Sequence, residues 1–406
     1  MRVKRKAPPL VLAFQRGFSQ MRRQILDGLS SYARSVGWRL QTVELDCRVL
    51  DGPSATPQEV KDLLSFWKPD GCLVECSGRD APSRAAFGRT PVVFMDAEAD
   101  LSADVDSLCT DARSIARLAA RELLLLGGHD VAYLPWTSAS TWSVDRGREF
   151  VKVVQANGRR AHVFSGSLDG DDPIVCVRRI ADWLEKLPKP CGIFAANDCM
   201  GSLALSACAR IGLSVPSEIA VVGVDDDGKV CENTPVTLSS VAIDFVDLGY
   251  VAAELLAGRL ADPRKKPRRM SFGGCHLVRR ASSRFTLKSD ARVSALLEYI
   301  RRHACNGLSA AQAAAQMGSG RRYVDRRFRE IVGKSILEEI QDVRIEKVKE
   351  LLCQRTVSLS ALPDFCGYHS LGDLRRVFRR RVGLSLTAYR RANGLESARC
   401  LGDSEE

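Results

Sequence analysis

The chain shows two different patterns of hydrophobic and polar positions, and one gives way to the other near residue 261. Before that point, short apolar runs alternate with amphipathic stretches. The runs that predict strands are Leu10–Phe14, Gly71–Cys76, Pro91–Asp96, Val131–Trp136, Gly192–Asp198 and Ile219–Asp225, and helices are predicted over stretches such as Ile25–Val36, Ser114–Leu126 and Met200–Ile211. Several of these strands are apolar on both faces, as expected when helices cover both sides of a parallel sheet. The pattern predicts a doubly wound α/β fold with enough units for two lobes.

The second pattern is helical throughout. The segment Ala261–Met270, ADPRKKPRRM, is rich in proline and basic residues and predicts a connector. Beyond Lys288, apolar residues recur every three to four positions, at Leu296, Leu297 and Ile300 and again from Ile336 to Leu352. We therefore predict a two-lobed α/β domain over residues 1–262, a basic linker with a final strand over 263–288, and an all-α domain over 289–406.

The all-α part contains an internal repeat, Leu308–Ile340 and Leu359–Arg390. Each half has a short apolar helix, a glycine corner and a second helix with a basic face. In the second helices Phe328 matches Phe378 and Gly333 matches Gly383. A glycine corner permits the positive φ that a tight helix-turn-helix requires. The repeat predicts two helix-turn-helix units.

The short stretch FCGYHS, Phe365 to Ser370, gathers a cysteine, a histidine and a serine around Gly367. A nucleophile needs an oriented base, and a metal site needs further ligands at short spacing. Neither accompanies this stretch, so we expect no catalytic or metal site here. We interpret it as the corner of the second unit, in which Cys366 ends one helix and Ser370 caps the next.

Charge supports a nucleic-acid partner for the all-α part. The formal net charge is +11, and residues 289–406 hold 21 Lys and Arg against 15 Asp and Glu. A basic segment of this kind favours double-stranded DNA as a partner, although a merely basic soluble surface has the same composition.

The fourteen cysteines are scattered without a CxxC pair. Thiols inside apolar runs are typical of a reducing compartment and not of a disulfide framework. The longest aliphatic run, Leu123–Leu126, is far too short to span a membrane, and the basic N-terminus has no cleavage-site pattern. We expect a cytoplasmic protein with no membrane association, no cofactor and no metal.

The two units joined by a long helix resemble the AraC family DNA-binding domain over about the last 110 residues. The motif GYHS followed by LRRVF, and the stretch RIEKVKELL, carry this resemblance. It implies that the second helix of each unit enters the major groove. The DNA-contacting residues implied are Arg321, Arg322, Asp325 and Arg326 in the first unit and Ser370, Gly372, Asp373, Arg375 and Arg376 in the second. Arg379, Arg380 and Arg381 are expected to bind phosphates.

Four positions depart from the family pattern, among them Leu374 in place of phenylalanine and Leu386 in place of proline. Gly320 stands where serine usually caps the first recognition helix, and Pro363 lies inside a predicted helix, where it removes a hydrogen bond.

The α/β part resembles the LacI-type regulators and periplasmic sugar-binding proteins. The stretch GIFAANDCMGSLALSACARIGLSVPSEIAVVGVDD carries the resemblance. It implies that ligand is held between two lobes by Asp111, Arg146, Asn197, Asp198 and Asp225. A helix cap is the structural alternative for one of Asn197 and Asp198.

Two tryptophans follow the fourth strand, and an aromatic ring suits the apolar face of a sugar. Trp136 and Trp142 are therefore ligand candidates, with packing in the core as the alternative. Phe18 and Ser19, after the first strand, are weaker candidates. Carboxylates, amides and arginine are the groups that best hold sugar hydroxyls.

A LacI-like sensor followed by an AraC-like reader is the order found in the xylose-responsive regulators of bacteria. This resemblance implies a homodimeric activator of sugar catabolism genes that binds xylose or a related sugar and works with RNA polymerase. Two alternatives stay open. The α/β part serves only for dimerisation, or the protein is a sugar-metabolising enzyme, although no phosphate loop, nucleophile elbow or dinucleotide fingerprint is present.

Overall fold

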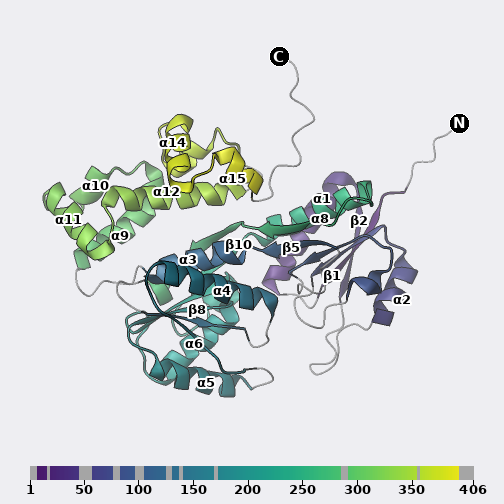
Figure 1. Cartoon of the computed structure of the whole chain (residues 1–406), viewed down its shortest axis with the longest axis horizontal. Coiled ribbons are helices and arrows are strands. Elements are labelled where there is room, and N and C mark those ends of the chain that lie inside the picture. The colour runs from purple at the N-terminus through teal and green to yellow at the C-terminus, as the bar shows by residue number, and fades with distance from the viewer. Residues whose placement is uncertain are drawn as a thin grey trace, which may run out of the picture.

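We describe a computed structural model of the chain, shown in Figure 1. The structure describes residues 7–15, 19–44, 57–75, 83–96, 105–124, 130–136, 140–168, 172–284, 291–353 and 357–392. Every statement below concerns these residues.

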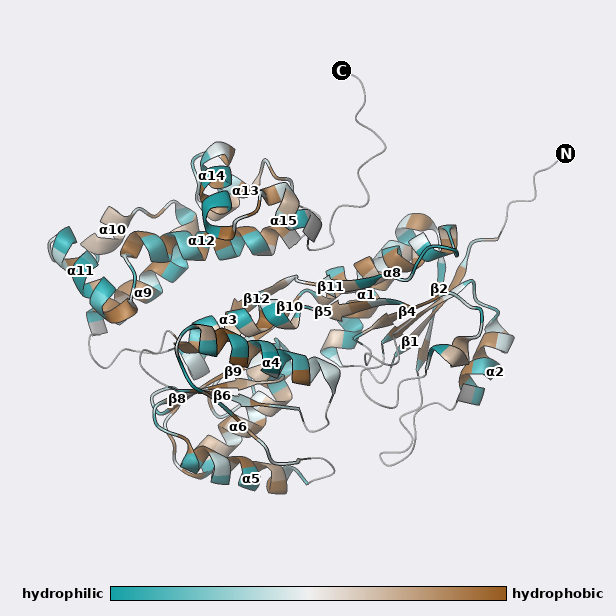
Figure 2. Ribbon diagram, viewed as in Figure 1, coloured by the Kyte–Doolittle hydropathy of each residue, from teal (hydrophilic) through white to brown (hydrophobic). Residues whose placement is uncertain are grey.

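The first lobe is built on a sheet of six parallel strands. Their order is β11-β5-β4-β3-β1-β2. The strands are β1 Leu10–Gln15, β2 Arg39–Glu44, β3 Gly71–Glu75, β4 Val92–Met95, β5 Asp106–Thr110 and β11 Arg269–Phe272. Helices α1 Gln20–Val36, α2 Pro57–Trp67 and α8 Phe245–Ala261 belong to this lobe. Strands β1 and β4 are brown in Figure 2 because they are apolar, as expected of strands covered by helices.

The second lobe repeats this plan. Its strand order is β12-β10-β9-β8-β6-β7, with β12 antiparallel to β10 and the other pairs parallel. The strands are β6 Val131–Leu134, β7 Ala161–Val163, β8 Cys191–Ala195, β9 Ile219–Asp225, β10 Ser239–Ile243 and β12 Cys275–Val278. The helices are α3 Ala112–Leu124, α4 Thr141–Ala156, α5 Pro173–Lys186, α6 Asp198–Arg210 and α7 Gly228–Cys231. The predicted two-lobed α/β architecture is confirmed.

The chain crosses between the lobes three times, after β5, after β10 and between β11 and β12. The second crossing leads into α8, which packs against α1 at two glycines. A Cβ on Gly28 would lie 1.9 Å from the carbonyl oxygen of Val246, and one on Gly249 would lie 2.1 Å from that of Ile25. Only glycine permits this close approach, so α8 is fixed against the first lobe.

The segment 263–288 differs from its prediction as a linker with one final strand. It contributes two strands, β11 to the first sheet and β12 to the second. Its proline-rich start leads into β11, whose Arg269 is aligned with Ser107 of β5. These two short strands lie in different sheets, one on each side of the third crossing, and so tie the lobes together.

The C-terminal part is all helical: α9 Ala291–His303, α10 Ala310–Ala315, α11 Arg321–Val332, α12 Ile336–Cys353, α13 Leu362–Cys366, α14 Leu371–Val382 and α15 Leu386–Ala392. It has two separate hydrophobic cores, and α12 supplies residues to both. Ile336 and Ile340 pack in the first core, whereas Val348 and Leu352 pack in the second. The long helix is therefore the spine that joins the two units.

The internal repeat appears in three dimensions. Phe328 of α11 and Phe378 of α14 are both fully buried. Both helices end at a left-handed glycine, Gly333 and Gly383, each with φ of 80°. The two predicted helix-turn-helix units are thus α10–α11 and α13–α14.

The stretch FCGYHS is a helix-turn-helix corner, as interpreted from sequence. Gly367 ends α13 with φ of 71°, and a Cβ there would lie 2.7 Å from the carbonyl oxygen of Cys305. The Ser370 side chain accepts a hydrogen bond from the Asp373 N–H and caps α14. The prediction for Pro363 needs correction, because this residue lies in the first turn of α13, where no backbone hydrogen bond is lost.

None of the helices in the described ranges is both long and apolar enough to cross a membrane.

Candidate functional site

Strained aspartates mark the strand ends that face between the lobes. Only four described residues other than glycine have positive φ: Lys68, Asp96 (47°), Asp225 (102°) and Asp226 (54°). Asp96 follows β4 of the first lobe, whereas Asp225 and Asp226 lie at the end of β9 in the second. Such conformations cost free energy and concentrate at binding and catalytic sites. Three of the four lie where a two-lobed α/β protein binds its ligand.

Arg146 of α4 lies at the centre of this region. Its side chain is only 5% exposed, and its Nη1 donates to the Ala196 carbonyl oxygen at 2.6 Å. Its Nη2 lies 3.9 Å from Oδ1 of Asp225, and its guanidinium carbon lies 4.7 Å from the ring centroid of Trp142. The buried Nε has no hydrogen-bond partner among the described residues. A buried donor without a partner is rare and points to a missing acceptor, such as a ligand oxygen.

Two carboxylates share the positive charge of Arg146. Burial raises the pKa of Asp225, Arg146 opposes that rise, and the charge of Asp96 adds to it. Burial likewise raises the pKa of Asp96, against hydrogen bonds from Thr110 and the charge of Arg146. We call Asp96, Arg146 and Asp225 the interlobe cluster. It joins the two lobes electrostatically, with one cation between two acids.

Asp96 was not among the residues proposed from sequence, although the strand Pro91–Asp96 was. Its carboxylate accepts from the Thr110 N–H at 2.6 Å and from the Thr110 hydroxyl at 3.3 Å. The sequence did offer a signal for this residue, because Asp96 is a polar residue at the carboxyl end of a predicted strand, where such folds bind ligands.

Asn197 and Asp198 have different roles. Asn197 is the N-cap of α6, and its Oδ1 accepts from the Met200 N–H at 3.0 Å. Asp198 is 2% exposed and accepts from the Ser240 hydroxyl at 2.6 Å and from the Asp227 N–H at 2.8 Å. The carboxylate of Asp198 thereby anchors the loop that carries Asp225. Its contact with ligand stays a prediction.

Asp111 is a local cap of α3. Its Oδ1 accepts from the Arg113 N–H at 3.0 Å, and its Oδ2 accepts from the Ser114 hydroxyl at 2.5 Å. Both carboxylate oxygens are thus used within one helical turn. Ser19 similarly caps α1, accepting from the Arg22 N–H. Phe18 lies outside the described residues.

The two tryptophans lie together beside the interlobe cluster. The ring centroids of Trp136 and Trp142 are 6.1 Å apart. Both are half-buried and pack against the main hydrophobic core, so packing in the core accounts for part of each side chain. The guanidinium of Arg146 covers Trp142. Their role as a sugar-stacking surface stays a prediction.

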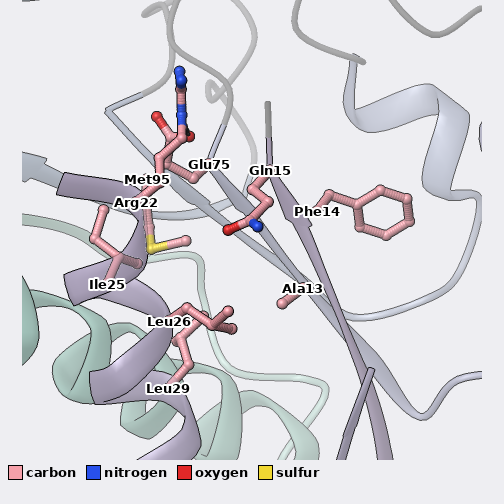
Figure 3. Close-up of a pocket in the computed structure, with 9 residues that line it drawn as sticks. All are labelled: Ala13, Phe14, Gln15, Arg22, Ile25, Leu26, Leu29, Glu75 and Met95. Atoms are coloured by element: carbon pink, nitrogen blue, oxygen red, sulfur yellow. Dashed lines mark hydrogen bonds and ion pairs between the residues drawn. The ribbon is translucent and has the colours of Figure 1, made fainter. Parts of the chain in front are cut away.

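The first lobe adds a small, mostly apolar pocket at the ends of β1 and β3, with three polar side chains in its lining (Figure 3). Arg22 pairs with Glu75 at 2.6 Å, and the buried Nε2 of Gln15 has no partner among the described residues. With about 10 Å³ of free space, the pocket has room for one water and for no sugar ring. It therefore offers a buried amide donor at the strand ends of the first lobe, without being a ligand site by itself.

The first candidate DNA-binding surface is a groove beside α11. Its lining includes all four residues proposed for this helix, Arg321, Arg322, Asp325 and Arg326. The three arginines are exposed. Asp325 instead accepts from the Ile336 N–H at 3.0 Å and so holds the start of α12. The structure thus exposes three arginines on this surface and gives the aspartate an internal role.

The second candidate surface is α14. Gly372, Arg375 and Arg376 are exposed on it. Arg376 lies 2.8 Å from Asp373, and Ser370 and Asp373 form the cap of the helix. Their contacts with DNA bases stay predictions. The Arg381 side chain is bound to Gln341 and Asp342 of α12, and its contact with a phosphate stays a prediction.

Comparisons with known proteins separate the same two parts. Residues 111–283 match the periplasmic binding protein-like domain, and residues 313–392 match a helix-turn-helix domain. The chain is 28% identical over 378 residues to the xylose operon regulatory protein of Escherichia coli K12, covering 91% of this chain and 94% of that protein. It is 25% identical over 296 residues to the protein of the same name in Haemophilus influenzae, covering 72% and 76%.

Among solved structures, one described as the xylose-binding transcription activator xylR matches with a TM-score of 0.59 and 25% identity, covering 96% of this chain and 99% of that chain. A transcriptional regulator CelR in complex with cellobiose matches with a TM-score of 0.56 and 21% identity, over 67% of this chain and 84% of that one. The second likeness supports the fold of the two lobes alone.

Proposed function

We propose that this chain, an AraC-type regulator with a periplasmic-binding-protein-like sensor domain, binds a small neutral carbohydrate between its lobes and double-stranded DNA through its two helix-turn-helix units. The proposal that the lobes bind a ligand rests on Arg146. Its buried Nε lies beside Asp225 and Trp142 and lacks a hydrogen-bond partner among the described residues. The DNA half rests on the paired recognition helices α11 and α14.

The chemistry of the interlobe cluster favours a neutral sugar over a sugar acid. Asp96 and Asp225 offer carboxylate oxygens to hydroxyl donors, and Arg146 offers an N–H to a ring or hydroxyl oxygen. Because two acidic side chains already surround one arginine, a uronate would bury its carboxylate beside Asp96 and Asp225, which disfavours its charged form. A pentose or hexose carries no charge.

The identity of the sugar is proposed from the relatives. Because the curated relatives are xylose operon regulators, we propose xylose or a related pentose as the effector and activation of sugar catabolism genes as the outcome. A homodimer in the cytoplasm that acts together with RNA polymerase completes the proposal. The protein acts by binding and does not turn its sugar over.

A second candidate is a DNA-binding protein whose α/β part only dimerises. The burial of both tryptophans against the core favours this candidate. The unpartnered donors of Gln15 and Arg146 count against it, because a site without ligand gains nothing by burying them.

Thermal unfolding of the purified protein against a panel of pentoses, hexoses and uronates tests the ligand half. A sugar at about a hundred times its dissociation constant stabilises the folded state by about 2.7 kcal/mol. We expect a shift with one neutral sugar, lost in Arg146→Ala and Asp225→Ala. Arg148→Ala, an exposed arginine on the same helix, is the matched control and keeps the shift.

A shift with a uronate alone would contradict the neutral-sugar proposal. No shift with any sugar, with DNA binding intact, would favour the dimerisation alternative. Conversion of the bound sugar to a product would establish an enzyme.

A further inference from the structure

The C-terminal end of α3 in the sensor domain contacts the DNA-binding domain, which lies along the side of the sensor domain that carries α3 (Figure 1). Arg121 lies 3.4 Å from Asp342 and 3.4 Å from Glu346, both on α12. The next residue, Glu122, reaches Arg301 of α9 at 4.0 Å. Arg121 and Glu122, two adjacent residues of opposite charge, therefore contact two different helices of the DNA-binding domain.

Glu122 is built into this contact. Its side chain is 2% exposed and is bound by Arg279 at 2.8 Å and by the Ser283 hydroxyl at 3.0 Å. Burial works against its charge, but Arg279 and Arg301 outweigh burial and lower the pKa of Glu122. Within the DNA-binding domain, Arg301 also lies 3.6 Å from the buried Glu339. A buried charge of this kind is costly unless its partners are in place, so the contact specifies one relative orientation of the two domains.

Asp342 extends the contact to both helix-turn-helix units. Lys334, in the turn after α11, lies 2.8 Å from Asp342. Arg381, in the last turn of α14, binds the same carboxylate and Gln341 beside it. One side chain on the spine helix α12 therefore joins Arg121 of the sensor domain to the ends of both recognition helices.

The opposite end of α3 begins beside the interlobe cluster. Thr110, two residues before α3, donates its N–H and its hydroxyl to Asp96. Asp111 then caps α3, and its own N–H donates to the Phe272 carbonyl oxygen of β11. A helix is a rigid element, so a change at Thr110 moves the far end of α3 as well.

We propose that Arg121 and Glu122 dock the DNA-binding domain on the sensor domain, and that Asp342 transmits this restraint to the relative orientation of the two recognition helices. The two recognition helices must enter successive major-groove segments about 34 Å apart. A restraint that fixes their mutual angle therefore decides whether both can bind at once. This inference concerns contacts within the chain and does not depend on the identity of the sugar.

The docking half is tested by small-angle X-ray scattering of the full chain after size-exclusion chromatography. Arg121→Glu places a negative charge beside Asp342 and Glu346, and we expect the radius of gyration to increase because the domains separate. Arg121→Gln, a milder change at a partly exposed site, gives a smaller increase in the same direction. Arg117→Glu makes the same charge change one turn earlier on the exposed face of α3 and leaves the scattering unchanged.

Unchanged scattering in Arg121→Glu, or an equal increase in Arg117→Glu, would overturn the docking role. Chromatography in the same experiment separates a change of oligomeric state from a change of domain orientation.

The transmission half is tested by DNA binding. A duplex selected by the wild-type protein from random sequences is the probe. Asp342→Asn removes the charge that Arg121, Lys334 and Arg381 share, and we expect about tenfold weaker binding to the selected duplex, the usual size for removal of one shared ion-pair partner. Binding to unrelated duplexes, which rests on phosphate contacts, stays unchanged.

Glu346→Gln is the matched control, because it removes one contact of Arg121 and leaves Lys334 and Arg381 on Asp342. Equal affinity of Asp342→Asn and wild type for the selected duplex would overturn the transmission role. So would an equal loss in Asp342→Asn and Glu346→Gln.

Discussion

The arginine at the centre of the interlobe cluster is buried, whereas the arginines of the recognition helices are exposed. Arg146 is 4% exposed and its guanidinium is held by a carbonyl oxygen, a carboxylate and an indole ring. Arg322 and Arg375 lie on the surface of α11 and α14. A buried charge needs fixed partners and is little affected by salt, whereas exposed charges bind phosphates in a salt-dependent way. Under the proposed function, the two domains would use arginine to recognise different partners.

The largest effect is expected at Arg146. Arg146→Met keeps the length of the side chain but leaves Asp96 and Asp225 without their shared cation. The variant also removes the N–H that Arg146 would donate to the sugar, and loss of a hydrogen bond to a charged group costs about 1.5–3 kcal/mol, so sugar binding should fall by about ten- to a hundredfold. Titration calorimetry with the sugar identified by the panel checks this. Sugar binding within about twofold of wild type would remove Arg146 from the site.

The next effect concerns the exposed arginines. We expect Arg375→Ala to cost about 1–3 kcal/mol of discrimination between the selected duplex and its base-substituted versions. We expect Arg380→Ala, on the same helix, to remove a phosphate contact and to weaken binding to every duplex alike. The slope of the logarithm of the binding constant against the logarithm of the salt concentration should become shallower by about one. Fluorescence anisotropy at several salt concentrations separates the two. If both variants lose affinity equally for all duplexes, α14 does not read bases through Arg375.

Buried carboxylates with raised pKa values make the stability of the sensor domain depend on pH. Burial, and then the charge of Asp225, raise the pKa of Asp198 from 3.8 to about 8. The folded state therefore keeps a proton that the unfolded chain has lost, and stability falls as pH rises between these values, by up to about 1.4 kcal/mol per pH unit. Asp96 and Asp225 contribute in the same direction.

Thermal unfolding between about pH 5 and about pH 8 measures this slope. Asp198→Asn cannot take up the proton, so its stability should depend less on pH. An identical slope in the variant, or a wild-type stability that rises over this range, would contradict the assignment.

The smallest effects compare the two helix-turn-helix units. Ser370 caps α14 with its hydroxyl, whereas Gly320 at the start of α11 makes no side-chain cap. We expect Ser370→Ala to destabilise the protein by about 1 kcal/mol, and Gly320→Ser to stabilise it by a few tenths. A Cβ at Gly320 meets no atom within 4 Å, so serine fits there. Denaturant unfolding measures both, and a destabilising Gly320→Ser would show that α11 does not use its cap position.

Much of the fold follows from periodicity alone. The strand Ile219–Asp225 was predicted to its ends because it is an unbroken apolar run between turn residues. The matched phenylalanines and glycines of the repeat predicted α11 and α14, because the same spacing produces the same buried face and the same left-handed end.

Other features required the three-dimensional structure. Strand β5 was missed because it carries Asp106 and Ser107, and the buried Asp106 is satisfied by Arg259, 153 positions away in sequence. The carboxylates of Asp111 and Asp325 proved to be used within the protein, because a sequence shows which residues bear charge and not which backbone N–H they meet. Such long-range pairings leave no local pattern.

In the proposed function, one chain couples the binding of a sugar to the binding of DNA. The most direct test measures the affinity for the selected duplex with and without the stabilising sugar, and the affinity for the sugar with and without the duplex. Because binding coupling is reciprocal, the account predicts that both affinities change by the same factor. No change in either affinity, with both ligands bound at once, would contradict it.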